Sequence, residues 1–98
     1  MSDQQEPKKV ELKIEMDDAT AQGIYANLAF ITHNETEFTL DFIYVQPQQP
    51  KAKVRARILS SPPHTKRFLK ALEENVKKYE SKFGVIKAAP EVDKKIGF

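Results

Sequence analysis

The residues best suited to acid–base or metal chemistry are two histidines, His33 and His64. His33 stands close to Glu35 and Glu37, so a metal or proton-transfer role can be considered for it, although a solvated loop has the same pattern. His64 lies in the first turn of a predicted helix. The sequence predicts no cleft around His33, and His64 has no nucleophile or carboxylate at a fixed spacing. We therefore predict no catalytic residue, no metal site and no enzyme.

Phosphate-binding and nucleophilic motifs are also missing from the sequence. The three glycines, Gly23, Gly84 and Gly97, are too far apart to form a glycine-rich phosphate loop. Ser60 and Ser61 lack the small-residue turn of a hydrolase nucleophile and are better explained as helix caps. The absence of cysteine excludes disulfides and thiolate zinc sites. We expect no cofactor.

The strongest chemical feature is a basic segment containing Lys51, Lys53, Arg55 and Arg57. On a regular strand these side chains share one face, where like charges repel each other unless negative groups lie nearby. Three interpretations follow: the segment binds nucleic-acid phosphates, it pairs with Asp41 or with acidic residues of a second subunit, or its charge protects a sheet edge from aggregation.

Charge is unevenly distributed along the 98 residues, although the formal net charge is only +2. Residues 1–50 carry a charge of −6, residues 51–82 carry +7 and residues 83–98 carry +1. Such a distribution suits an acidic partner, nucleic acid or a second copy of the chain.

Apolar residues alternate with charged ones in segments 10–16 and 52–60, and segments 24–32 and 38–46 are rich in aromatic and β-branched residues. These patterns predict four antiparallel strands in a meander. Residues 33–37 suit the loop of the second hairpin. If Thr32 pairs with Phe38, then Phe30 faces Leu40 on the core side of the sheet. Continuing this register places further pairs opposite each other: Leu28 and Phe42, Ala26 and Tyr44, Leu40 and Ile58, Phe42 and Ala56, Tyr44 and Val54, and Asp41 and Arg57.

A long amphipathic helix follows the last predicted strand. Ser60 and Ser61 precede Pro62 and Pro63, a typical helix start, and Gly84 suits a C-cap. Apolar residues recur at spacings of three and four and form one stripe: Thr65, Phe68, Leu69, Leu72, Val76, Tyr79 and Phe83. The predicted fold class is α+β, a four-stranded antiparallel sheet with this helix packed on one face.

The opposite face of the predicted sheet is too apolar to remain in water, so we expect a homo-oligomer. Its polar members Asn27 and Asp41 need partners, either within one subunit or across an interface. The predicted interface residues are Tyr25, Asn27, Ile31, Asp41, Ile43, Val45 and Arg57.

The chain is expected to contain one domain, residues 9–86, between a flexible arm (1–8) and a flexible tail (87–98). No apolar run approaches the roughly 20 residues that span a bilayer, and the polar first residues do not resemble a secretory signal. A cytoplasmic protein with no membrane partner is therefore expected.

Several segments together resemble a family of bacterial proteins of about one hundred residues that is known as a domain of unknown function. These segments are 23–29 (GIYANLA), 37–42 (EFTLDF) and 63–72 (PHTKRFLKAL), with Tyr79-Glu80 and Phe83-Gly84 downstream. The resemblance implies no activity and no functional residue.

The order of four strands and a long helix is also similar in architecture to the SecB type of export chaperone, which forms oligomers and holds unfolded clients. Fold alone does not define function. The leading hypothesis is a non-enzymatic, homo-oligomeric binding or adaptor protein, with a protein partner or client and a chaperone-like role. The alternative is a nucleic-acid-binding protein that uses residues 51–57.

Overall fold

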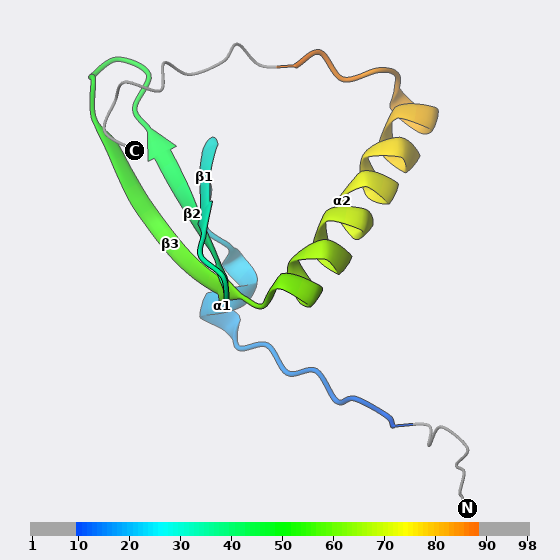
Figure 1. Cartoon of the computed structure of the whole chain (residues 1–98). Coiled ribbons are helices and arrows are strands. Elements are labelled where there is room, and N and C mark those ends of the chain that lie inside the picture. Colours follow the sequence, from blue (N-terminus) through cyan, green and yellow to red (C-terminus); the bar gives the residue numbers. More distant parts are fainter. Residues whose placement is uncertain (1–9, 89–98) are drawn as a thin grey trace, which may run out of the picture.

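The computed structural model describes residues 10–88, which form a three-stranded antiparallel sheet followed by a long helix (Figure 1). The elements, in chain order, are α1 (Asp18–Gln22), β1 (Leu28–His33), β2 (Phe38–Val45), β3 (Ala52–Ser60) and α2 (Pro62–Phe83). The predicted α+β class and the order of sheet and helix are confirmed. The predicted arm (1–8) and most of the predicted tail (87–98) lie outside the described residues.

β2 is the central strand of the sheet, and its pairing with β3 follows the predicted register over most of its length. Leu40 lies opposite Ile58, and Asp41 lies opposite Arg57. A bulge then shifts the register, because Phe42 pairs with Ala56 whereas Ile43 pairs with Val54. The predicted pairing of Tyr44 with Val54 is therefore wrong, and Tyr44 lies opposite Lys53 instead.

The predicted register of the β1–β2 hairpin is wrong by one residue. His33, not Thr32, pairs with Phe38, so the connecting loop has four residues, 34–37. Asn34 closes this loop, since its side-chain oxygen accepts hydrogen bonds from the backbone N–H groups of Thr36 (2.8 Å) and Glu37 (2.9 Å). An Asn that bonds to the backbone two residues later is a known turn former.

This shift of one residue exchanges the two faces of β1 relative to β2, because side chains alternate along a strand. Ile31 lies opposite Leu40, and Ala29 lies opposite Phe42. Phe30 pairs with Asp41, not with Leu40. The expected core face, with Leu28 and Phe30 beside Leu40 and Phe42, is therefore not formed. The expected opposite face also breaks up, because Ile31 lies on the Leu40 side of the sheet.

The fourth predicted strand, at residues 10–16, is not confirmed. Residues 10–17 are neither helix nor strand, and they extend away from the sheet and from α2 (Figure 1). The short helix α1 follows, and Asp17 caps its start by accepting a hydrogen bond from the backbone N–H of Thr20 at 2.7 Å. Gly23 ends α1 with φ 78° and ψ 169°, a conformation essentially restricted to glycine.

α2 begins and ends where the sequence predicts. Ser61 is the N-cap and accepts a hydrogen bond from the backbone N–H of His64, Pro62 and Pro63 occupy the first turn, and Gly84 follows the last residue. The predicted packing of α2 flat on the sheet is not found, because the helix diverges from the strands along its length (Figure 1). None of the described helices is long and apolar enough to cross a membrane.

Buried side chains are few in residues 10–88. Leu40 and Ile43, both on β2, are the only large apolar side chains in this part of the chain that are buried, and of the two Ile43 is buried completely. The apolar residues of α2 from Phe68 to Phe83 all remain substantially exposed. The described part of one chain thus encloses a very small core.

Candidate functional site

An open apolar groove lies between the sheet and the first half of α2. It has a volume of about 560 Å³. The sheet contributes Ile31, Phe38 and Leu40, and the helix contributes Pro62, Thr65, Lys66, Phe68, Leu69 and Leu72. This surface, called the apolar groove below, offers a binding site for an apolar segment of another chain or of a second copy.

The groove results from local sequence features at the turn between β3 and α2. The Ser61 cap and Pro62 start the helix immediately after Ser60, the last residue of β3. With so short a connection the first turn of α2 stays close to the sheet, while the rest of the helix diverges (Figure 1). The apolar stripe of α2 therefore lines the groove at its first half, where Phe68 and Leu72 lie, and continues beyond it as an exposed surface.

Asp41 and Arg57 form the predicted ion pair across β2 and β3. Arg57 donates from Nε to Asp41 Oδ1 at 2.7 Å and from its terminal nitrogen to Oδ2 at 2.9 Å. The Asp41 side chain is 8% exposed, whereas that of Arg57 is 64% exposed. The hydrogen bond from Arg57 lowers the pKa of the Asp41 carboxyl, and the same bond raises the pKa of Arg57. Such a two-pronged pair fixes the register of the two strands.

Asn27 also has partners within its own chain. Its side-chain nitrogen donates to the backbone oxygen of Val45 at 3.0 Å, and its side-chain oxygen accepts from the Val45 backbone N–H at 2.8 Å. The Asn27 side-chain amide therefore makes the two hydrogen bonds to Val45 that a backbone peptide group of a paired strand would make. It extends the hydrogen bonding between the β1 and β2 sides of the sheet to Val45, the last residue of β2. The two polar residues that needed partners, Asn27 and Asp41, are both satisfied within one chain.

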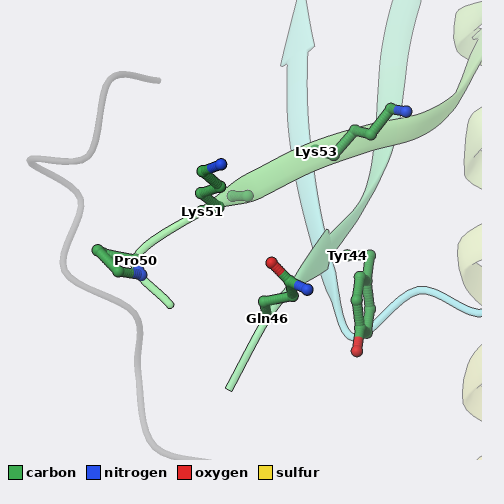
Figure 2. A pocket seen from close by; sticks show the side chains of 6 residues that line it. Tyr44, Gln46, Pro50, Lys51 and Lys53 are labelled. Atoms are coloured by element: carbon green, nitrogen blue, oxygen red, sulfur yellow. The ribbon is translucent and has the colours of Figure 1, made fainter. Parts of the chain in front are cut away.

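A second, basic cleft lies at the turn between β2 and β3 and has a volume of about 670 Å³. Its lining comes from both arms of the turn: Tyr44, Gln46, Pro50, Lys51, Ala52 and Lys53 (Figure 2). The Tyr44 ring meets Tyr25 edge to face, with 6.1 Å between ring centroids. One aromatic ring, that of Tyr44, and the two basic residues Lys51 and Lys53 thus line the same cleft, a combination that suits an anionic or aromatic ligand.

The sequence predicts that the basic residues of β3 share one face of the sheet, and this prediction is wrong. Lys53 lies opposite Tyr44 and Arg57 lies opposite Asp41, while the bulge leaves Arg55 between them without a partner residue on β2. The bulge separates the charges and relieves part of the expected repulsion. Arg57 is engaged by Asp41, which leaves Lys51, Lys53 and Arg55 as the basic residues available to a ligand.

Each of the two histidines lies beside one neighbouring side chain, a phenylalanine for His33 and an arginine for His64. The His33 ring lies against the Phe38 ring, with 5.3 Å between centroids, at the end of the β1–β2 hairpin. His64 Nδ1 lies 3.5 Å from a terminal nitrogen of Arg67 in the first turns of α2. Within residues 10–88, no three His, Cys, Asp or Glu side chains come together in a way that could hold a metal ion.

The predicted interface residues do not form one continuous surface. Ile43 is completely buried within the chain, and Tyr25 packs against Tyr44. Val45 is half-buried at the end of β2. Ile31 lies in the apolar groove, on the opposite side from Asp41 and Arg57. Of this set, Ile31 is therefore the residue best placed to meet a second chain.

Sequence reasoning missed two contributors to these surfaces. The sequence prediction gives Phe38 a place in a strand but no part in a binding surface, yet Phe38 lines the apolar groove. The signal that could have placed it is Asn34, because the short loop that Asn34 closes sets the register of Phe38. Tyr44 was assigned to the core, yet it lines the basic cleft, because the bulge places it opposite Lys53. A bulge has no clear sequence pattern in this strand.

Residues 1–88 match a protein family described as "Protein of unknown function (DUF3467)". The chain belongs to this family. The DUF3467 match covers the whole sheet, α2 and both candidate surfaces, and it confirms the resemblance to a family without known activity. No curated protein and no solved structure matches the chain.

Proposed function

We propose that this DUF3467 protein is a non-enzymatic binding or adaptor protein of the bacterial cytoplasm, that it works as a homo-oligomer, and that it holds protein clients in a chaperone-like manner. The observation that carries the proposal is the apolar groove together with the exposed stripe of α2. Apolar patches of this kind on a small protein are typical of surfaces that bind another chain.

Energetic reasoning supports the oligomer. A chain of this length normally buries well over half of the surface that its unfolded form exposes. In the described residues, however, the buried large apolar side chains are only Leu40 and Ile43. Burying one exposed Leu, Phe or Val is worth roughly 1.5–3 kcal/mol. Covering the stripe of α2 with a second chain would therefore contribute a large share of the stability of the fold.

The first experiment measures mass by light scattering at micromolar concentration. We expect a multiple of the 11.2 kDa chain mass, and a monomer would contradict the proposal. The second measures how well the protein suppresses the aggregation of reduced, denatured lysozyme. We expect suppression that is lost in Leu69→Asp, which places a charge in the groove. Suppression should be kept in Lys70→Asp, which introduces the same residue at the neighbouring position on α2, outside the groove lining.

The alternative function, nucleic-acid binding, is favoured by the presence of the Tyr44 ring in the same cleft as Lys51 and Lys53 (Figure 2). Single-stranded nucleic acid is commonly bound by basic grooves with aromatic rings on which bases stack. Under this alternative, a labelled single-stranded oligonucleotide binds more weakly as salt is added. Changing Lys53 and Arg55 together to Gln then flattens the logarithmic salt dependence by about 1.4 units.

Two outcomes separate the alternatives. Loss of oligonucleotide binding in Tyr44→Ala, with the lysozyme assay unchanged, would favour the basic cleft as the functional site. Capture of partners from native cells, with and without nuclease treatment, gives the second comparison. Partners that survive nuclease treatment support the protein-binding proposal, whereas their complete loss supports the alternative.

A further inference from the structure

The two edges of the sheet differ in how they are protected against pairing with another strand. Among the described residues the strand order is β1-β2-β3, so β1 and β3 are the edges. β3 carries Lys53, Arg55 and Arg57 and a bulge at Arg55, which are common protections of an edge. β1 has the sequence Leu-Ala-Phe-Ile-Thr-His, with no Lys, Arg, Asp, Glu or Pro, and its register with β2 is regular. By this comparison, β1 is the edge suited to receive a further strand.

A segment with the pattern of such a strand is present in the same chain. Apolar and charged residues alternate strictly through residues 10–16. Its four apolar side chains, Val10, Leu12, Ile14 and Met16, are 64–84% exposed. An extended chain that alternates in this way buries its apolar side when it joins a sheet whose neighbouring face is apolar.

The turn at α1 directs this segment away from the sheet of its own chain. Asp17 caps α1, and the Gly23 N–H bonds to the Thr20 backbone oxygen at 3.0 Å, so the short helix is closed at both ends. Residues 10–17 then extend away from the sheet and from α2 (Figure 1). A segment held in this direction is available to another copy of the chain.

We infer that residues 10–16 of each copy pair with the outer edge of β1 in a second copy, so that each sheet gains its fourth strand from the partner. This inference rests on the proposed homo-oligomer and specifies its interface. Reciprocal exchange closes the assembly as a two-fold dimer, whereas one-way exchange would produce open filaments. The added strand lies next to Ile31, so its apolar side chains extend the floor of the apolar groove.

Cross-linking tests the pairing directly, because the chain contains no cysteine of its own. Leu12→Cys and Ala29→Cys, which lie on the same side of the sheet in the proposed pairing, are placed in two copies with different tags, coexpressed, and treated with a short bismaleimide that tolerates a shift of a residue or two. We expect a product that carries both tags. The matched control replaces Ala29→Cys by Arg55→Cys on β3, and we expect little product from it.

Two results would overturn the inference: no product that carries both tags with Ala29→Cys, or a product at least as strong with Arg55→Cys. Light scattering separates this outcome from a failure of the proposed function. Leu12→Asp with Ile14→Asp should give monomers, while Lys13→Asp, with the same change in net charge, should not. A wild-type monomer would contradict the oligomer itself, whereas an oligomer that survives the double change would contradict only the strand exchange.

Discussion

Asp41 and Arg57 are unequal partners, because the carboxylate is buried and the guanidinium is mostly exposed. Removing Arg57 leaves a buried carboxylate without its cation, whereas removing the charge of Asp41 leaves a guanidinium that water can solvate. We therefore expect Arg57→Gln to destabilise the fold more than Asp41→Asn does. Urea denaturation of both single variants and the double variant measures the coupling. Equal losses from the two single changes would contradict this account.

The same pair predicts a pH dependence. The pKa of Asp41 is lowered below its ordinary value of 3.8, chiefly by the hydrogen bond from Arg57. The unfolded chain therefore binds a proton at a higher pH than the folded chain, so the stability that the pair supplies is present above the unfolded pKa and is lost as pH falls through the folded one. Denaturation followed from about pH 5 to pH 2 should show this loss in the wild type. The Asp41→Asn variant should lack that part of it.

At the scale of elements, the sequence predicted where strands and helices lie much better than how the first hairpin pairs. The β2–β3 register was correct around Asp41 because the apolar residues of the two strands agree in phase there, and this agreement also brings Asp41 opposite the positive charge of Arg57 as a second mark of the register. No pair of opposite charges identifies the β1–β2 register in the sequence. Phe30 and Ile31 are both apolar, so either side chain can face the core. When both faces of a strand are apolar, the pattern does not specify register, and the Asn34 loop decides it instead.

The turn at Gly23 gives a prediction at this scale. With φ 78° and ψ 169°, Gly23 has a backbone conformation that other residues avoid, and a Cβ there would meet no atom within 4 Å. Gly23→Ala should thus cost about 1–3 kcal/mol through backbone strain alone. Urea denaturation measures it, with Gln22→Ala as the neighbouring control. A loss no larger than that of the control would show that the turn relaxes without cost.

For the whole molecule, the periodicity of α2 showed that one side of the helix must be buried but not which surface covers it. The sequence prediction assigned that role to the sheet of the same chain, and the structure instead leaves the stripe of α2 exposed. A hydrophobic stripe is the same whether its partner is the chain's own sheet or a second copy. Oligomeric contacts therefore could not be distinguished from internal packing by pattern alone.

The Leu72→Ala variant tests whether the stripe of α2 packs within one chain or against a second copy. If Leu72 belonged to a closed core, Leu72→Ala would cost about 2–5 kcal/mol at any protein concentration. Because Leu72 is 51% exposed in one chain, we expect an intrinsic cost of only about 1 kcal/mol. The remaining cost should arise from contacts with a second copy.

The wild-type melting temperature should then rise with protein concentration, since mass action stabilises a folded oligomer. The gap between the wild type and Leu72→Ala should widen as the solution is concentrated, and a gap that is constant over a hundredfold range would place Leu72 in an internal core instead.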